Sequence, residues 1–480
     1  MDDQQTPPTS EPELRERPVA KRFRIKHLYL PLVALLIAGS FSLGFLFGSN
    51  YPKVLGRQTV KANLPIVPPD PFPDQPLRKY SIQNLQSYPF QVSEITLEKV
   101  LEKRPEFTAY LFSYKTLGKK MTGQMNIPNQ AAEKELPVIV MIRGYVDVEE
   151  YHTGMGTAPV AAEFAKAGYV TVAPDFLGFG GSDPAGPGWE ERFEKPVNVI
   201  ELIKSIRLHN QLVFKDTTFK INPQQMGLWA HSNGGQISLS TLEALGESIP
   251  LAVWAPVTAP FPYSVLFYSD EMEDGGAAMR ATVAGFESIY NVQEYSLTQY
   301  IDRLMGPIQL HQGTADEEVP KKWSDEFIKK IKQENERRVL AQEELTKKLA
   351  QAEAERKAAI AATASSLPSP ILVAAASPSA SPLAVGTPAT SAGTLAIGST
   401  SAASGAAIAS GSTSLILADT QPSAGNLSDV STSMKVENIF LKPIELNYFV
   451  YQGGNHFIRP GWEEAVARDL KFFDQYVRSR

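Results

Sequence analysis

The chain has 480 residues, a formal net charge of −6 and no cysteine. This length allows two or three domains. The negative charge, together with the lack of any basic, aromatic-rich patch, argues against nucleic-acid binding. Without cysteine there are no disulfides, no thiol catalysis and no cysteine-bound metals. No histidine–carboxylate cluster has metal-ligand spacing, so no metal or cofactor is expected.

The N-terminus predicts a membrane anchor. Residues 1–27 are polar, with a basic second half, and residues 28–48 carry no charge over a length that spans a bilayer. No small-x-small cleavage site follows, which favours an uncleaved anchor over a signal peptide. The basic flank is expected to stay inside. We therefore expect a single-pass protein of the cell membrane, with a cytoplasmic N-terminus and an extracytoplasmic catalytic domain; a buried core helix is the alternative.

The next part of the chain predicts a spacer followed by an α/β domain. Residues 49–89 are proline-rich, as in a semi-extended linker. Residues 107–114 and 121–127 have strand character and flank a turn at 115–120, which indicates a hairpin. From there to Ala255, strand-like and helix-like segments alternate, the pattern of a mostly parallel sheet with crossover helices. Helices are expected at 158–167, 195–208 and 236–245.

A serine on a sharp turn is the main chemical feature. Residues 226–230 are apolar and read as a buried strand, a helical pattern follows, and Ser232 lies between them. This is the nucleophile-elbow pattern G-x-S-x-G, with Ala230 in the first glycine position. In such a turn the hydroxyl projects from the sheet, and the N–H of Asn233 can serve an oxyanion hole. The motif alone also occurs by chance in loops.

Two histidines could complete a triad, whose members run in the order Ser, Asp or Glu, His in this kind of sheet. Only His311 and His456 follow His231, the direct neighbour of Ser232. His456 lies in a glycine-rich turn after the strand-like run 446–450, from which its ring can reach the serine. The simpler interpretation of His456 is a loop histidine that bonds a backbone carbonyl.

The acid is expected in the turn after His311. Asp316 is placed to hold the imidazole tautomer and stabilise the imidazolium, and Glu317 and Glu318 are the nearest rivals. Asp316 could instead serve as an Asx-turn or helix N-cap residue.

Five motifs, in order, resemble the α/β-hydrolase superfamily. They are Arg143–Tyr145, Ala173–Ser182, His231–Gly235, His311–Asp316 and Gly453–His456. The set is most similar to the catalytic domains of prolyl-oligopeptidase-type serine peptidases and to dienelactone-hydrolase-like enzymes, over residues 90–332 and 436–480.

The resemblance implies an α/β-hydrolase fold with a catalytic site. Ser232 would be the nucleophile, His456 the general base and acid, and Asp316 the orienting acid. The oxyanion-hole N–H groups would come from Tyr145 and Asn233. Arg143 departs from the histidine usual before the glycine. Its simplest interpretation is a surface arginine that pairs with a nearby carboxylate, namely Asp147, Glu149 or Glu150.

Two further segments stand out. Residues 257–304 are helical and aromatic-rich, and we expect them to cover the site and set its specificity. Their acidic patch reads as a solvated loop, with attraction of a cationic substrate as the alternative; it comprises Asp270, Glu271, Glu273 and Asp274. Residues 333–435 form an insertion, first a charged helical run with few apolar positions for a coiled coil, then an Ala/Ser/Thr/Pro-rich stretch predicted to be disordered. Residues 436–480 supply the last strand, the histidine loop and a C-terminal helix.

These observations predict a membrane-anchored serine hydrolase without a cofactor, acting on a peptide or ester. A prolyl-oligopeptidase-like serine peptidase is the first hypothesis. Residues 49–106 are too few for the β-propeller that such peptidases carry, so a carboxylesterase or dienelactone-hydrolase-like esterase is the second. A non-catalytic hydrolase-fold protein that binds a surface partner is the third. The membrane contact would be made by residues 28–48.

Overall fold

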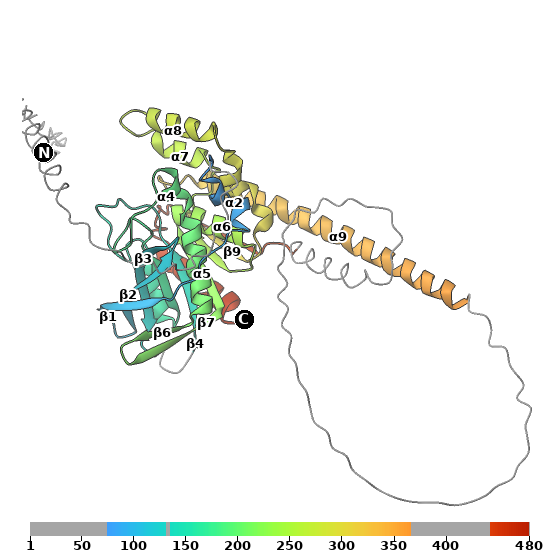
Figure 1. Ribbon diagram of the computed structural model, residues 1–480, viewed down its shortest axis with the longest axis horizontal. Helices are drawn as coiled ribbons and strands as arrows, with labels where there is room; N and C mark the ends of the chain where they lie inside the picture. Colours follow the sequence, from blue (N-terminus) through green and yellow to red (C-terminus); the bar gives the residue numbers. More distant parts are fainter. Residues whose placement is uncertain (1–73, 131–134, 366–441, 480) are drawn as a thin grey trace, which may run out of the picture. The chain divides into compact units, whose positions relative to one another are not determined.

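A central sheet organises the computed structural model, which describes residues 74–130, 135–365 and 442–479. Nine of its strands follow the order β1-β2-β3-β5-β4-β7-β8-β9-β10, and β6 pairs with β7. Figure 1 shows the sheet with helices beside it. The strands are β1 (Thr96–Lys103), β2 (Phe107–Thr116), β3 (Lys119–Pro128), β4 (Glu135–Ile142), β5 (Val170–Pro174), β6 (Gln211–Phe214), β7 (Thr217–His231), β8 (Leu251–Trp254), β9 (Ile308–Gly313) and β10 (Leu446–Tyr451).

The sheet is mostly parallel, as predicted. Strands β5, β4, β7, β8, β9 and β10 run parallel to one another, whereas β1, β2 and β3 form an antiparallel meander that joins β5, and β6 is antiparallel to β7. The predicted hairpin is present, but its turn is shorter than residues 115–120. Thr116 pairs with Lys119, which leaves only Leu117 and Gly118 in the loop. Both have positive φ, as a two-residue turn between twisted strands requires.

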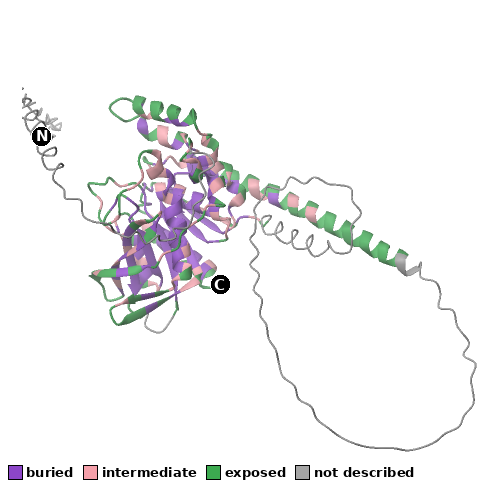
Figure 2. Ribbon diagram, in the orientation of Figure 1, coloured by how far each residue is buried: buried purple, intermediate pink, exposed green. Residues whose placement is uncertain are grey.

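Strand β4 shows how the core is built. Every residue after Glu135 is buried, because helices cover both faces of the sheet. Its side chains alternate between two apolar clusters: Val138 and Val140 pack with residues of α5 and α6, and Ile139 and Met141 pack with residues of α3 and α11. Figure 2 shows this sheet and its covering helices as the buried part of the molecule.

The helices follow the predicted alternation. The predicted helix at 195–208 has the observed bounds of α5, and those at 158–167 and 236–245 correspond to α3 and α6. The helices are α2 (Ile82–Leu85), α3 (Ala158–Lys166), α4 (Trp189–Phe193), α5 (Lys195–Leu208), α6 (Asn233–Leu245), α7 (Tyr263–Ser269), α8 (Ala277–Glu287), α9 (Lys321–Ser365) and α11 (Trp462–Phe473). Short 3-10 turns are η1 (Arg78–Tyr80), η2 (Val292–Tyr295), η3 (Leu297–Gln299) and η4 (Ile301–Arg303), and the π-helical turn η5 (Asp474–Arg478) ends the described chain.

Helix α9 begins in the domain and continues beyond it. Trp323, Phe327 and Ile331 are buried, whereas most residues after Arg338 are exposed (Figure 2). This agrees with the charged helical run expected at the start of the insertion. Residues 366–441, which include the stretch expected to be disordered, lie outside the described residues.

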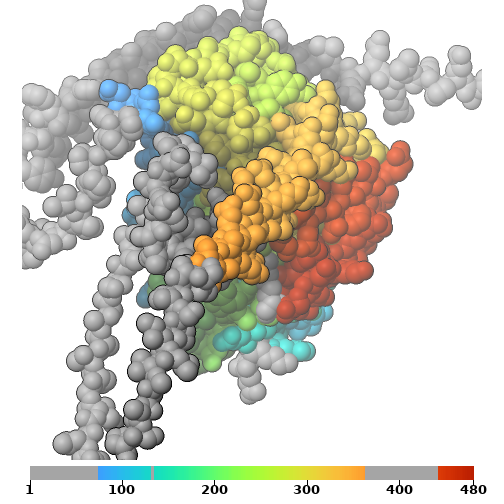
Figure 3. Space-filling view, turned by 90° about the vertical axis from the view of Figure 1, so that its right-hand side faces the viewer, coloured from blue at the N-terminus to red at the C-terminus, as the bar shows by residue number. Residues whose placement is uncertain are grey.

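A clasp closes the base of the insertion. The Asn335 side-chain amide donates to the carbonyl oxygen of Ile444 at 2.8 Å, and its side-chain oxygen accepts from the Ile444 N–H at 2.7 Å. The buried guanidinium of Arg338 donates to the carbonyl of Lys442 at 2.8 Å, and to those of Ile301, Asp302 and Leu304. Figure 3 shows this part of α9 against the C-terminal segment. The chain therefore leaves and re-enters the domain at one place.

The predicted anchor at 28–48 lies outside the described residues. Among the residues that are described, no helix is both long and apolar enough to cross a bilayer.

Candidate active site

The turn at Ser232 is sharp. Strand β7 ends at His231, α6 begins at Asn233, and Ser232 between them has φ 54° and ψ −123°. A non-glycine residue in this region of backbone space is strained, and such strain clusters at functional sites. The Ser232 N–H donates to the carbonyl of Trp254 at 2.9 Å, which fixes the turn to the neighbouring strand.

The neighbours of the serine must be small. A Cβ on Gly144 would lie 2.9 Å from the Ser232 Cβ, and one on Gly234 would lie 2.2 Å from the carbonyl oxygen of Ile142. A Cβ on Gly235 would meet Pro256 at 2.4 Å. The end of β4, the serine turn and α6 are therefore in direct backbone contact, as the elbow pattern requires.

The structure brings Asp316 and His456 together. His456 Nδ1 lies 3.1 and 3.0 Å from the two carboxylate oxygens, although the residues are 140 positions apart. Burial raises the pKa of Asp316, but hydrogen bonds from His456 and the Val319 N–H outweigh this effect and lower it overall. Asp316 is therefore ionised at neutral pH, and it orients His456 with Nδ1–H toward the carboxylate and Nε2 free to accept a proton.

His456 lies beside the serine turn. Its ring centroid is 4.5 Å from that of His231, the residue before Ser232. Within the described residues no hydrogen bond joins Ser232 to His456. Instead His456 Nε2 lies 3.5 Å from the Glu318 carboxylate, whose side chain is 64% exposed. In substrate-free enzymes such catalytic hydrogen bonds are often long and tighten only in the complex.

His231 holds the histidine loop. Its Nε2–H donates to the carbonyl oxygen of His456 at 3.0 Å, and its ring stacks on Phe457. Burial first, and then repulsion from His456, lower the pKa of His231 to about 4. His231 is therefore neutral at physiological pH and acts as a fixed hydrogen-bond donor.

The loops after β9 and β10 are tied to one another. Gly454 accepts a hydrogen bond from the Ala315 N–H at 2.9 Å, and a Cβ on Gly313 would lie 2.1 Å from the Gly454 carbonyl oxygen. This close approach explains the glycines in the two motifs. It also fixes Asp316 and His456 relative to one another.

Two N–H groups lie where an oxyanion hole is expected. Asn233 is the first residue of α6, and the first N–H groups of a helix have no partner within it. Tyr145 follows Gly144, whose α-carbon faces Ser232; the Tyr145 side chain points outward and its hydroxyl donates to Asp147 at 2.6 Å. Only the backbone of Tyr145 is therefore available to the site.

The interpretation of Arg143 as a surface residue is wrong. Its side chain is buried and donates to the carbonyls of Gly144 and Asp175, both at 2.9 Å. The guanidinium lies 4.1 Å from the ring centroid of Phe179 and 4.5 Å from that of Tyr151. Arg143 therefore supports the loop that carries the Tyr145 N–H. In the described part of the chain it forms no ion pair with Asp147, Glu149 or Glu150.

Asp175 shapes the turn next to this loop. Its carboxylate accepts hydrogen bonds from Thr122 at 2.6 Å, Tyr151 at 2.7 Å and Thr153 at 2.9 Å. Burial raises the pKa of Asp175 despite these bonds. A Cβ on Gly180, which has φ +58°, would lie 2.4 Å from the carboxylate. These contacts agree with a structural role for Asp175 and its glycines.

His311, the other candidate histidine, lies in the interior. Its Nε2 is 2.9 Å from Asp469 on α11 and its Nδ1 is 2.7 Å from the Tyr451 hydroxyl, so both ring nitrogens are occupied. Gln309 and Trp254 also donate to Asp469, each at 2.7 Å. Sequence reasoning did not identify Asp469, because nothing near it in the chain marks it as a partner of β9.

Helix α7 reaches the acid loop. Burial, followed by the Asp316 and Glu318 carboxylates, raises the pKa of Tyr268, while Arg192 lowers it. The Tyr268 hydroxyl is therefore within electrostatic range of all three groups.

The carboxylates of the acidic patch bind groups close to them in the chain. Asp274 accepts from the N–H groups of Gly276 and Ala278, and Asp270 pairs with Arg280 at 3.1 Å. This agrees with a solvated loop.

No family model and no curated protein matches the chain. Among solved structures it is similar to acetyl xylan esterase 1 from a Thermoanaerobacterium species, with 13% identity and a TM-score of 0.38 over 51% of this chain and 80% of the other. It is also similar to a puromycin-hydrolysing peptidase from Mycobacterium tuberculosis, with 11% identity and a TM-score of 0.42 over 78% of this chain and 40% of the other. A third similar structure is a dipeptidyl aminopeptidase IV homologue from Bacteroides ovatus, with 12% identity and a TM-score of 0.40 over 78% of this chain and 36% of the other.

Proposed function

We propose that this protein is a serine hydrolase with Ser232 as nucleophile, His456 as general base and acid, and Asp316 as the residue that orients His456. One observation carries the proposal: the strained Ser232 turn lies directly beside a hydrogen-bonded histidine–aspartate pair. A nucleophile, a base and a group that orients the base are the three parts that acyl transfer by serine needs.

The reaction would proceed in two steps. Ser232 Oγ attacks the substrate carbonyl while its proton moves to His456 Nε2, and the N–H groups of Tyr145 and Asn233 stabilise the oxyanion. The bond to the leaving group then breaks, and His456 protonates that group. Water attacks the acyl-enzyme by the same route, with His456 again as base. Asp316 stays ionised throughout and stabilises the imidazolium.

The same machinery serves amides and esters. A prolyl-oligopeptidase-like peptidase is our first candidate and a carboxylesterase or dienelactone-hydrolase-like enzyme is the second. Turnover of peptide amides against short acyl esters separates the two, and absence of any amide cleavage would eliminate the peptidase.

The decisive experiment is labelling of the full-length protein with a fluorophosphonate probe. We expect the wild type to be labelled and Ser232→Ala and His456→Ala not to be. Ser238→Ala is the matched control, because Ser238 is a buried serine on the same helix and should leave labelling intact. Absence of labelling in folded wild-type protein would contradict the proposal and favour the non-catalytic hypothesis.

We also propose that residues 28–48 anchor the protein in the cell membrane, with the catalytic domain outside the cytoplasm. The uncharged length of this segment and its basic flank support this. The full-length protein should stay with membranes after an alkaline carbonate wash, and a chain without residues 1–48 should be released. Release of the full-length protein would contradict the anchor.

A further inference from the structure

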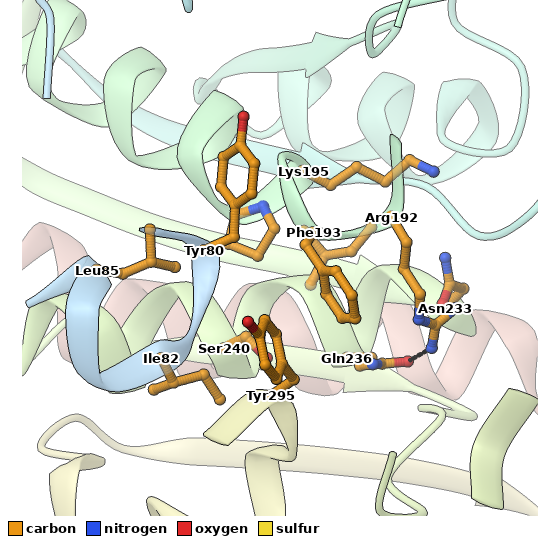
Figure 4. A pocket seen from close by; sticks show the side chains of 12 residues that line it. Tyr80, Ile82, Leu85, Arg192, Phe193, Lys195, Asn233, Gln236, Ser240 and Tyr295 are labelled. Atoms are coloured by element: carbon orange, nitrogen blue, oxygen red, sulfur yellow. Dashed lines mark hydrogen bonds between the residues drawn. The ribbon is translucent and has the colours of Figure 1, made fainter. Parts of the chain in front are cut away.

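A small cavity lies one residue from the nucleophile. Its volume is about 30 Å³, room for about two waters or for one carboxylate group. Helices α4, α5 and α6 and the Tyr80–Leu85 segment surround it (Figure 4). Its polar lining consists of Tyr80, Arg192, Lys195, Asn233, Gln236, Ser240 and Tyr295.

Arg192 brings an uncompensated positive charge to this cavity. Its guanidinium donates to the side-chain oxygen of Gln236 at 2.7 Å, and Figure 4 shows the two beside Asn233. In the described part of the chain no carboxylate lies within ion-pair distance of Arg192, and its Nε is buried without a partner. Burial lowers the pKa of Arg192 to about 10, so it remains charged at neutral pH.

Two arginines are buried in the described part of the chain, whereas Arg192 is partly buried. Arg338 is bonded to Glu334 and to carbonyl oxygens, and Arg143 is bonded to two carbonyl oxygens, although its Nε also lacks a partner. Near Arg192, Glu191 is engaged with Lys195 at 3.1 Å. A charge held in a low-dielectric site costs free energy unless it is paired, so Arg192 favours an anion that the chain does not supply.

The Arg192 guanidinium lies near the proposed nucleophile, Ser232. Helix α6 begins directly after Ser232, and Asn233 and Gln236, three residues apart, are neighbours on its first turn. Asn233, whose N–H is part of the proposed oxyanion hole, lines the cavity as well. The Tyr295 hydroxyl is a further buried polar group without a partner among the described residues, and it also lines the cavity.

We propose that this cavity is a substrate subsite in which Arg192 binds a carboxylate about one helical turn from the reacting carbonyl. The inference rests on the proposed serine hydrolase function, and it names the substrate class: esters or amides of dicarboxylic acids, or of leaving groups that bear an acid. A guanidinium and a carboxylate form paired, charge-assisted hydrogen bonds, which fix the substrate as well as attract it.

Matched substrates test the inference on the full-length protein. The 4-nitrophenyl half-ester of glutaric acid carries the anion on the acyl side, and 4-nitrophenyl valerate is its neutral counterpart. The butyryl ester of 4-hydroxybenzoate places the anion on the leaving side, with phenyl butyrate as its counterpart. We expect one anionic substrate to have the higher kcat/KM, and the pair that shows the preference identifies the side.

Arg192→Gln should lower kcat/KM for the preferred anionic substrate about 10- to 100-fold and change that for its neutral counterpart less than about threefold. For Arg192→Lys, which keeps the charge without the planar guanidinium, we expect a kcat/KM for the anionic substrate between those of the wild type and Arg192→Gln. Arg207→Gln is the control, because Arg207 lies on α5 and pairs with Glu247. Equal losses for both substrates in Arg192→Gln, or no charge preference in the wild type, would overturn the inference.

A binding measurement separates this inference from the proposed function. Calorimetric titration of monomethyl glutarate into Ser232→Ala requires no catalysis. Binding that disappears in Ser232→Ala/Arg192→Gln supports the subsite even if the wild type hydrolyses nothing. Absence of binding in Ser232→Ala, in protein whose wild-type form is labelled by fluorophosphonate, would overturn the subsite and leave the serine hydrolase proposal intact.

Discussion

The molecule contains two histidine–aspartate pairs of nearly the same length. His456 and Asp316 meet at 3.0 Å in the loops after β10 and β9, and His311 and Asp469 meet at 2.9 Å between β9 and α11. The two pairs differ in their surroundings. Both pairs are buried, but both nitrogens of His311 have partners in the interior, whereas His456 Nε2 faces the exposed Glu318 side chain.

The comparison teaches that pairing alone does not make a catalytic histidine. A carboxylate orients either ring, but general-base catalysis also needs a free nitrogen within reach of a nucleophile and of substrate. The loop position of His456 provides this access. The strand position of His311 makes it a cross-link between β9, β10 and α11. Four substitutions test this contrast.

The largest effect is expected from Asp316→Asn. An asparagine keeps the size of the side chain but no longer fixes the imidazole tautomer or stabilises the imidazolium, so kcat should fall on the order of 10⁴-fold. Steady-state hydrolysis of an activated ester measures this, with the melting temperature as the check on folding. A loss of less than tenfold in well-folded protein would mean that Asp316 is a structural turn residue.

The next effect concerns stability rather than rate. Asp469→Asn weakens the buried acceptor of His311, Gln309 and Trp254, so the free energy of unfolding should fall by about 1–3 kcal/mol. Activity per folded molecule should stay within about threefold of the wild type. Denaturant unfolding and active-site titration measure the two quantities. A large loss of activity at unchanged stability would assign catalysis to the buried pair.

A pH effect is expected from His231, which connects the serine turn to the histidine loop. Its pKa is about 4 in the folded protein against 6.5 in the unfolded chain. Between these values the unfolded state binds more protons, so stability falls as pH decreases from about 6.5 to about 4, by at most about 3 kcal/mol in total. His231→Gln should remove this part of the pH dependence of unfolding. An unchanged pH profile in the variant would show that His231 does not titrate on unfolding.

The smallest effect is expected from Glu318→Gln. The Glu318 side chain is mostly exposed and lies 3.5 Å from His456 Nε2, and such surface pairs contribute about 0–1 kcal/mol. We expect kcat/KM to change less than about fivefold. A loss as large as that of Asp316→Asn would make Glu318 the acid that serves His456.

Much of the fold could be predicted because its signals are local. The apolar run of β4, the strand before Ser232 and the helix-like run of α5 each indicate their element without reference to the rest of the chain. Strand β1 was not predicted, because its side chains are mostly exposed and charged and it pairs at the edge of the sheet. Edge strands of this kind lack the apolar alternation that marks a half-buried strand.

The candidate site was predictable in part for the same reason. Ser232 is marked by its turn, and the order of the loops points to Asp316 and His456. The role of Arg143 was not predictable, because its partners, Tyr151 and Phe179, come from separate loops that only the folded chain brings around it. The unpaired charge of Arg192 is likewise a property of the packing, since Glu190 and Glu191 beside it in sequence suggest partners that it does not have.

The clasp between α9 and the chain near Ile444 divides the protein in an unusual way. Ser232 and Asp316 precede the insertion and His456 follows it, so the proposed catalytic set is split between two stretches that the clasp and the β9–β10 pairing hold together. The chain between Arg338 and Lys442 connects the two stretches covalently. A chain cut within it would have the layout of a complementation pair, in which hydrolysis reports the reunion of two separate polypeptides.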